Sequence, residues 1–361
     1  MNSGVPLGCP AANLSVIPSF PPEYNGVIPS GAACALCWER REKGRPNIMS
    51  VYLPEGLLLD TPENIRLTGS PAGMAQAMAQ GSILEGRAVL CDYGHDLLVD
   101  LGWCRGLIPR TEGALGIAEG STRDIAIISR VNKPVSFVVQ ELRELPQGKL
   151  LPILSRRLAQ ERCREEYLSR LVPGDVIPGR VTHLEPFGCF VDIGCGLPSL
   201  IPIDQISVSR IAHPRDRFRT GEDIRAVVRS LDPEAGGRIC LTHKELLGSW
   251  EENAARFSPG ETVAGVIRSV EEYGVFVELA PNLAGLAEPC SGVTPGQQAS
   301  VYIKSILPGK MKIKLIIVDA FDAPWSPAPL RYFFQGSHME RWRYSTPQSS
   351  KVVETVFEGE G

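Results

Sequence analysis

The amino-acid sequence predicts an all-β protein made of three tandem five-stranded barrels joined by short α-helical linkers. Glycine and proline, 36 and 30 of the 361 residues, together make up about 18% of the chain. The usual share is roughly 12%, and the excess favours turn-rich β structure over helical bundles. A block of short strands also recurs, opening at Gly86, Gly179 and Gly265, with starts 93 and 86 residues apart. Five short strands separated by turn signals, repeated three times, are typical of small closed barrels.

Each block contains the same succession of strands. An opening strand is followed by an alternating strand, a short apolar strand and two further strand-like runs. The alternating strands lie at 97–102, 189–194 and 275–280, and the short apolar strands at 106–109, 199–202 and 285–288. The last two runs are 223–232 and 238–243 in the second block, and 299–307 and 311–318 in the third.

Two stretches of helix-forming composition separate the blocks, and each stops at a Pro-Gly pair. These signals divide the chain into eight segments. They are a low-order leader (1–48), an N-terminal extension (49–80), a degenerate first barrel (81–154), a helical linker (155–171), a second barrel (172–242), a second helical linker (243–258), a third barrel (259–319) and an aromatic and basic tail (320–361).

The leader is rich in proline and has no sustained period, and an ordinary protein start follows at Met49. We hypothesise that the biological chain begins at Met49 and that the leader is translated upstream DNA. Mass spectrometry tests this, since a native peptide containing Cys34 and Cys37 would contradict it. Those two cysteines form the only CxxC motif of the sequence, and without a second pair at metal-ligand spacing we expect no metal ion there.

The overall charge excludes one class of nucleic-acid binder. The formal net charge is −4, so no uniform positive field attracts duplex DNA or an anionic membrane. A histone-like or polybasic protein is therefore excluded, whereas a single-strand binder that uses local patches is not. No apolar run is long enough for a membrane span and no secretory signal opens the chain. We accordingly expect a cytoplasmic protein with free thiols and no membrane partner.

Alternation along the second strand of each block divides its side chains between two faces. In the third block Val277 points to the expected core, whereas Phe276 lies with Glu278 on a polar face. The second block repeats this pattern, with Phe190 on the same face as Asp192. We therefore expect both phenylalanine rings to be exposed.

A second aromatic residue precedes each of these strands across a glycine, as Phe187-Gly188 and Tyr273-Gly274. The glycine permits a bulge or a close backbone approach. Any one of these rings alone could be core filler. Two rings around a glycine in both blocks favour a stacking platform for unpaired bases.

Basic side chains are spaced so that they fall on compatible faces of the later strands. Such residues can neutralise phosphates locally while acidic residues elsewhere set the net charge. A single charge of this kind is usually just solvated, and it is the convergence beside the aromatic residues that favours binding. The basic candidates are Arg225 and Arg229 in the second block, Lys304, Lys310, Lys312 and Lys314 in the third, and the loop residues Arg210, Arg215, Arg217 and Arg219; Tyr302 shares the face of Lys304 and is a further candidate.

The first block departs from the other two. Leu98 stands where they carry a phenylalanine, and Tyr93 and His95 stand near the other ring position with a one-residue offset. We expect this barrel to contribute structure or protein contacts more than base stacking.

The second block resembles the S1 RNA-binding domain, the OB-fold repeat of bacterial 30S ribosomal protein S1. The resemblance rests on PGDVIPGRVTHLEPFGCFVDIG at 173–194 and GRICLTHKE at 237–245, and PGETVAGVIRSVEEYGVFVELA at 259–280 is a looser copy. Together the matches cover roughly residues 82–319. The resemblance implies that the four aromatic residues stack on RNA bases, that Arg238 and Asp232 support the same face, and that Lys244 of the GRIxLTxK pattern belongs to it.

The tail leaves two interpretations open. Trp325, Trp342 and Tyr344 interleave with arginines such as Arg341, a mixture suited to RNA contact. The alternation in KVVETVF at 351–357 equally indicates a strand packed onto the last barrel.

No P-loop, GxSxG elbow or HExxH motif is present, and the five histidines lie in separate segments. We interpret Asp192 with Glu185 as solvated positions rather than a catalytic pair. We therefore expect a non-catalytic protein without cofactor or small-molecule substrate that binds single-stranded RNA such as mRNA in translation, in contact with the 30S ribosomal subunit. The alternative is a scaffold or RNA-decay factor whose barrels dock on a ribosome or nuclease partner.

Overall fold

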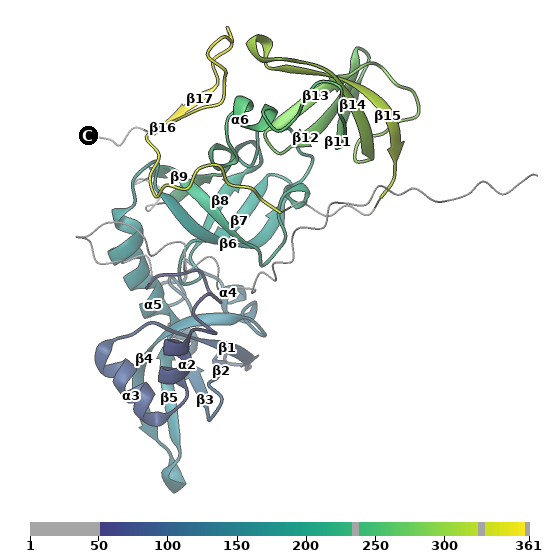
Figure 1. The fold of residues 1–361 in the computed structure, drawn as a ribbon. Helices are drawn as coiled ribbons and strands as arrows, with labels where there is room; N and C mark the ends of the chain where they lie inside the picture. Colours follow the sequence, from purple (N-terminus) through teal and green to yellow (C-terminus); the bar gives the residue numbers. More distant parts are fainter. Residues whose placement is uncertain (1–50, 233–237, 324–328, 358–361) are drawn as a thin grey trace, which may run out of the picture. The chain divides into compact units, whose positions relative to one another are not determined.

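The computed structural model describes residues 51–232, 238–323 and 329–357. Three closed five-stranded barrels make up most of this part of the chain, which confirms the predicted all-β fold class (Figure 1). The expectations about the leader, the start at Met49 and the Cys34–Cys37 motif concern residues outside the described ones, and so does Trp325 of the tail.

Two short helices, α2 (Pro62–Thr68) and α3 (Pro71–Gln80), form within the stretch expected to be an extension. Each begins with a proline after a capping hydroxyl, because a hydroxyl oxygen can accept an N–H that the first turn leaves unpaired. The Thr61 side chain accepts the N–H of Asn64, and the Ser70 hydroxyl accepts the N–H of Gly73. The sequence therefore encodes both helix starts locally.

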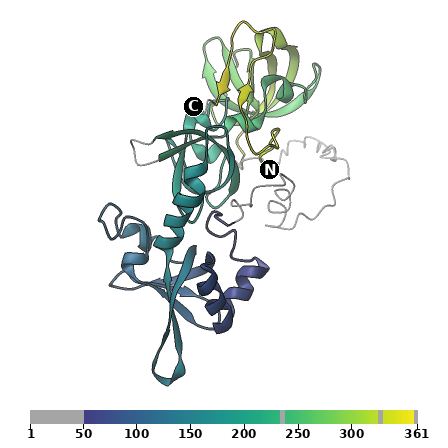
Figure 2. The same ribbon diagram turned by 90° about the vertical axis from the view of Figure 1, so that its left-hand side faces the viewer.

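The first barrel has the strand order β1-β2-β3-β5-β4, and the ribbon view shows the β4–β5 hairpin projecting beyond it (Figure 2). Its core is aliphatic, with Phe137 as its largest fully buried side chain. The elements are β1 (Leu84–Cys91), β2 (Leu97–Asp100), β3 (Arg105–Ile108), the 3₁₀ turn η2 (Arg110–Glu112), α4 (Ile125–Ile128), β4 (Pro134–Glu144), η3 (Pro146–Gly148) and β5 (Leu150–Ser155).

The first linker begins at Ser155, whose hydroxyl accepts the N–H of Leu158 and caps α5 (Arg156–Arg162). It continues as a π-helical turn, η4 (Cys163–Tyr167), and a 3₁₀ turn, η5 (Leu168–Arg170). The second barrel follows with the strand order β10-β8-β7-β6-β9. Its elements are β6 (Val176–Glu185), β7 (Gly188–Asp192), β8 (Pro198–Pro202), η6 (Ile203–Gln205), η7 (Pro214–Asp216), β9 (Asp223–Asp232) and β10 (Arg238–Thr242).

The second linker is shorter than the first and consists of η8 (Lys244–Leu247) and α6 (Trp250–Ala254). Ser249 and Glu252 form a reciprocal capping box at the start of α6. The third barrel has the order β11-β12-β13-β15-β14, and a two-stranded sheet follows it. The elements are β11 (Thr262–Glu271), β12 (Gly274–Ala280), β13 (Leu283–Ala287), β14 (Gln298–Leu307), η9 (Pro308–Lys310), β15 (Lys312–Phe321), β16 (Arg341–Arg343) and β17 (Glu354–Val356).

A β-bulge lies at the same place on the first strand of all three barrels. The pairing with the second strand shifts between Ala88 and Leu90, between Val181 and His183, and between Ile267 and Ser269. A bulge re-aims the side chains that follow it. Equivalent positions in the three barrels can therefore be compared by register rather than by sequence alignment.

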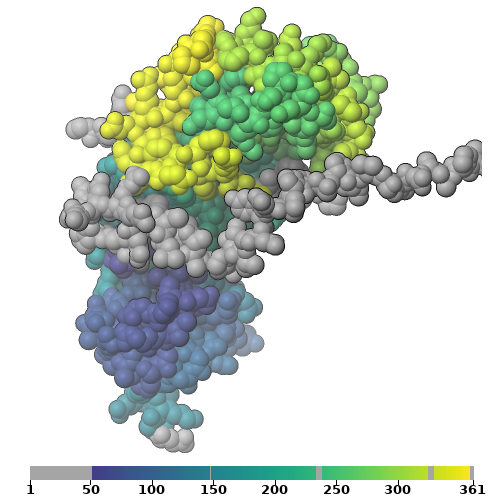
Figure 3. Space-filling view, in the orientation of Figure 1, coloured from purple at the N-terminus to yellow at the C-terminus, as the bar shows by residue number. Residues whose placement is uncertain are grey.

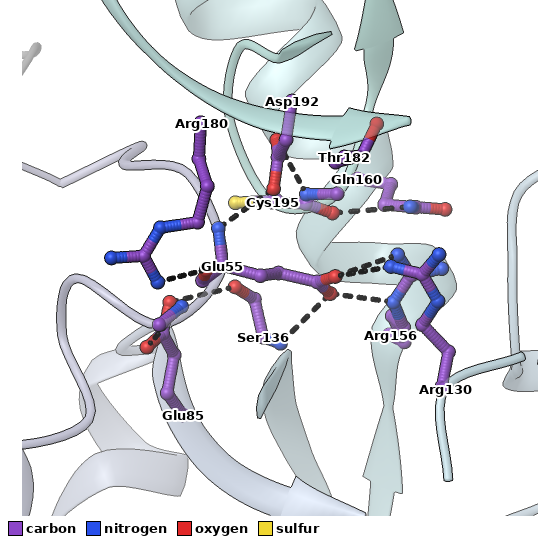
Figure 4. Close-up of polar contacts among 12 residues, drawn as sticks. Glu55, Glu85, Arg130, Ser136, Arg156, Gln160, Arg180, Thr182, Asp192 and Cys195 are labelled. Atoms are coloured by element: carbon purple, nitrogen blue, oxygen red, sulfur yellow. Dashed lines mark hydrogen bonds and ion pairs between the residues drawn. The ribbon is translucent and has the colours of Figure 1, made fainter. Parts of the chain in front are cut away.

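A buried ionic cluster joins the first barrel to the second (Figure 4). The Glu55 carboxylate, which precedes α2, binds the Arg156 guanidinium of α5 at 2.6 Å and Arg130 at 3.2 Å. The Glu55 N–H donates to the Asp192 carboxylate of β7 at 2.7 Å. Burial alone would raise the pKa of Glu55, but the charge and hydrogen bonds of Arg156, the charge of Arg130 and the N–H of Ser136 together outweigh burial and lower it. The cluster ties four segments of the chain together.

The second and third barrels share a second set of buried contacts. The Arg217 guanidinium, before β9, lies 2.6 Å from the Glu278 carboxylate of β12, and Arg268 of β11 binds the same carboxylate at 2.8 Å. Asn282 adds hydrogen bonds across the joint, accepting the N–H of Val208 and donating to the carbonyl of Lys244. These contacts join the second and third barrels through buried polar groups.

The tail packs across both of these barrels. Trp342 and Tyr344 are buried in one cluster with core residues of the third barrel and with Val176 and Val227 of the second. The space-filling view shows this segment in yellow, lying against the green surface of the second linker and the third barrel (Figure 3). Of the two interpretations of the tail, these buried rings match the packed one.

Candidate nucleic-acid interface

An aromatic pair stands at the start of β7 in the second barrel. The rings of Phe187 and Phe190 meet edge to face, with centroids 6.0 Å apart and planes 89° apart. Phe187 keeps 56% of its surface exposed, and Phe190 is half-buried beside it. A methyl group at Gly188 would come within 2.5 Å of the carbonyl oxygen of Ile201. Only glycine permits this close approach of β7 to β8, which places the two rings together.

The third barrel carries the same arrangement on β12. The rings of Tyr273 and Phe276 have centroids 6.1 Å apart and planes 86° apart, and Tyr273 is 66% exposed. A side chain at Gly274 would collide with the carbonyl oxygen of Ala287. Two barrels that differ in most of their sequence thus hold the same edge-to-face pair with an open outer ring. Such a pair offers a flat apolar surface for unpaired bases.

The strand register shows which residues flank each inner ring. Phe190 lies between His183 on β6 and Leu200 on β8, and the His183 ring is 6.5 Å from it. Phe276 lies between Ser269 on β11 and Leu286 on β13, whose partner on β15 is Lys314. The sequence analysis did not include His183 among its binding residues. Alternation alone could not find it, because the bulge after Val181 moves it opposite Phe190.

The fourth strand brings a basic residue near the row of side chains that contains the inner ring, and it does so in both barrels. Each has a bulge, and the extra residue is Arg229 on β9 and Lys304 on β14. The residues that follow these two pair with Cys240 and Lys314. Cys240 and Lys314 pair in turn with Leu200 and Leu286, which lie next to Phe190 and Phe276. Both basic side chains are exposed, and Lys304 makes an ion pair with Glu288 at 3.2 Å.

The remaining candidates are more scattered. Lys310, Lys312, Arg238 and Tyr302 are exposed and Lys244 is half-buried. Arg225 lies elsewhere, because its guanidinium donates to the carbonyl oxygens of Phe334 and Gly336 in the tail. Some of the predicted residues therefore lie near the aromatic pairs, whereas Arg225 is hydrogen-bonded to the tail.

The expectation that Glu278 and Asp192 lie on an exposed polar face is wrong. Both carboxylates are buried, Glu278 against Arg217 and Arg268, and Asp192 against three backbone N–H groups, those of Glu55, Gly194 and Gly196. Alternation assigned their face correctly, but neighbouring segments cover that end of the strand. For the same reason Arg217, expected in a phosphate-binding loop, is a buried structural residue.

The first barrel lacks the platform at the equivalent positions. By register, Leu98 occupies the position of the inner ring, and Leu90 and Leu107 flank it. The bulge of β4 carries Gln140 in place of a basic residue. Tyr93 is fully exposed. The barrel presents aliphatic side chains where the others present rings.

Two buried carboxyl groups, Asp192 and Glu85, have raised pKa values. Burial, together with the Glu55 charge, raises the pKa of Asp192 to about 7, and burial raises that of Glu85 to about 8. Such shifts can mark active sites. Here the oxygens accept backbone N–H groups, and Asp192 is not paired with Glu185, which binds His183 instead at 2.6 Å. Among the described residues no group of three His, Cys, Asp or Glu is placed to hold a metal ion.

Repeated small β-barrels with paired aromatic rings are typical of proteins that bind nucleic acid. Residues 171–244 match the S1 RNA-binding domain family, which confirms the resemblance seen in the sequence. The second barrel is therefore similar to an S1 domain over its whole length. In the part of the chain that the structure describes, no helix is both long and apolar enough to cross a membrane.

The chain is similar to small ribosomal subunit protein bS1 of Leuconostoc lactis, with 30% identity over 72% of this chain and 61% of the relative. It is equally similar, at 30% over 63% of this chain and 61% of the relative, to the bS1 homolog of Bacillus subtilis. The chain thus spans about three fifths of the length of these relatives. A solved multidomain protein with nucleic acid binding domains from Streptococcus pneumoniae covers 66% of this chain and 74% of its own, with 14% identity and a TM-score of 0.22. A TM-score this low supports no conclusion about a shared fold or function.

Proposed function

We propose that this chain is a non-catalytic RNA-binding protein of the ribosomal protein S1 type, which holds single-stranded RNA such as mRNA for translation in the cytoplasm. The observation that carries the proposal is the edge-to-face pair that recurs in the second and third barrels, each with a basic residue at the bulge of the fourth strand. The similarity to relatives named as small ribosomal subunit proteins supports a place at the 30S subunit.

The mechanism follows from the chemistry of these side chains. Exposed rings stack on base faces, which every base offers, so binding tolerates sequence variation. Arg229 and Lys304 neutralise phosphates near the rings. Because the barrels are linked in one chain, occupation of one raises the effective RNA concentration at the next.

The experiment replaces both inner rings, as Phe190→Ala with Phe276→Ala. Base stacking on an aromatic side chain contributes about 1–3 kcal/mol by alanine substitution, so we expect roughly 5- to 150-fold weaker binding for each ring that stacks. Gel-shift or anisotropy titration with unstructured RNA measures the effect. Leu98→Ala is the matched control, because Leu98 occupies the same register position in the first barrel. Unchanged affinity of the double variant would refute the platform assignment.

A second function is favoured by the aliphatic band of the first barrel, which suits a protein contact better than a base. In this case the barrels form a scaffold that docks on a ribosome or nuclease partner. Salt distinguishes the two functions, because phosphate neutralisation makes log affinity fall steeply with log salt concentration. A polysome-gradient profile tests the translation role: co-migration with 30S subunits that survives nuclease treatment indicates a protein contact.

A further inference from the structure

A hollow of about 590 Å³ lies between the second and third barrels, next to the carboxylates that hold the joint, since Asp216 and Arg268 are among its lining residues. The second barrel lines it with Leu184, Arg215, Arg219 and Thr220, and the third barrel lines it with Val266 and Arg268. Neither barrel alone forms this cleft. We refer to these six residues as the inter-barrel cleft.

The cleft is basic although the whole chain is acidic. Arg215 and Arg219 are exposed at its rim. Among the described residues, no carboxylate is paired with the Arg215 guanidinium. Arg268 is ion-paired with Asp216 at 3.2 Å, so the acidic group at the cleft is already engaged. At the rim, Arg215 therefore presents its positive charge to solvent.

Buried polar contacts hold the two barrels together beside the cleft. Arg268, which lines the cleft, binds the Glu278 carboxylate that also lies 2.6 Å from Arg217, and the N–H of Ser209 donates to the carbonyl of Pro281 at 3.1 Å across the joint. Breaking a buried ion pair of this kind leaves an uncompensated charge, so the joint resists opening. A site that needs no rearrangement avoids the ordering cost of binding.

We propose that the inter-barrel cleft binds the sugar-phosphate backbone of a single-stranded RNA that runs from one barrel to the other. The inference rests on the proposed function and extends it, since it adds a phosphate site that neither aromatic pair provides. Guanidinium groups match phosphate oxygens in a planar, two-pronged geometry. Leu184 and Val266 supply apolar surface for ribose or a base, and the Thr220 hydroxyl can donate to a phosphate oxygen.

The test removes the two rim charges, as Arg215→Gln with Arg219→Gln. Both side chains are exposed, so the fold should be retained, and thermal melting verifies this. Each lost phosphate contact lowers the slope of log affinity against log salt by about 0.7 for a single strand. With an unstructured RNA of about 20 nucleotides we expect the slope to fall by about 1.4, whereas an oligonucleotide of about 5 nucleotides, which fits one barrel, keeps its slope.

The matched control is Arg143→Gln with Lys149→Gln, which removes the same charge from the exposed β4–β5 hairpin of the first barrel. An equal change of slope in this control would overturn the cleft, because the effect would then come from net charge. An unchanged slope in the cleft variant, with binding still weakened by Phe190→Ala and Phe276→Ala, would overturn the cleft and leave the proposed function standing. If neither the cleft variant nor the phenylalanine variant changes RNA affinity, but the cleft variant no longer binds an acidic peptide, the cleft binds a protein partner and the RNA proposal is refuted.

Discussion

His243 shows at the scale of one residue how packing makes stability depend on pH. Its ring is fully buried between Phe218, at 4.9 Å, and Tyr332 of the tail, at 5.6 Å. The Nδ1 atom lies 3.0 Å from the carbonyl oxygen of Ile206, and Nε2 lies 3.2 Å from the Tyr332 hydroxyl. Burial lowers the pKa of His243 to about 4. The folded protein thus keeps the ring neutral where the unfolded chain protonates it.

We predict that His243 makes the protein less stable as pH falls from about 6.5 to about 4. In that window the unfolded chain binds a proton that the folded protein does not, so the free energy of unfolding decreases with falling pH, by about 3 kcal/mol in all. Denaturant unfolding at several pH values measures it. The raised pKa values of Asp192 and Glu85 have the opposite effect, since they increase the free energy of unfolding as pH falls. The reference is therefore the His243→Gln variant, which keeps both carboxyl groups. Parallel pH profiles for the two proteins would refute the assignment.

The turn between the first two strands is the element that positions the aromatic pairs. In the second and third barrels a glycine sits where β7 or β12 approaches the next strand too closely for a side chain. The repetition of this contact explains why both pairs adopt the same edge-to-face geometry. The turn with its glycine and both rings, rather than either ring alone, is what the two barrels share.

Substitution of that glycine should weaken both the fold and the platform. In Gly188→Ala the new methyl group meets a backbone oxygen, so β7 or β8 must shift, and we expect a loss of about 1–3 kcal/mol in unfolding free energy. RNA affinity should fall as well, because the rings move with the strand. Gly309→Ala is the control, since its nearest atom would lie 3.7 Å away and we expect a change within about 0.5 kcal/mol. Equal melting temperatures for the two variants would contradict the close-approach argument.

At the scale of the whole molecule, the second and third barrels and the tail behave as one packed unit. Their largest buried cluster contains Val176 of β6, Val301 of β14 and Trp342 of β16. Tyr344 donates its hydroxyl hydrogen to the Asn282 carbonyl oxygen and so fastens the tail to the joint. The first barrel has a separate core and meets the second barrel through the polar cluster around Glu55.

Trp342→Ala tests this coupling. Truncation of a buried tryptophan costs about 3–5 kcal/mol, and the cavity lies in a core that both barrels share. We therefore expect faster amide hydrogen exchange in β9 and β14 together, with little change in the first barrel. The exposed Val352→Ala in the same tail is the control. Faster exchange confined to β16 and β17 would mean that the tail is a separate element.

The sequence by itself determined the three barrels, the two glycine-spaced aromatic pairs and the helical linker that begins at Ser155. These features depend on residues close together in the chain, so alternation, turn residues and capping chemistry are sufficient to predict them. Alternation predicted that Phe190 and Phe276 are exposed, whereas both are half-buried between buried neighbours on the same strand.

Only the tertiary structure decided which charges stay available to a ligand. Glu55 meets Arg156 and Asp192 across 101 and 137 residues, and Arg217 meets Glu278 across 61. No local pattern encodes such pairs, because a buried charge depends on partners that distant segments bring to it. For this reason Asp192, Glu278 and Arg217, predicted to be exposed, turned out to be buried. The same long-range packing placed Trp342 and Tyr344 of the tail in a core and formed the basic cleft between two barrels.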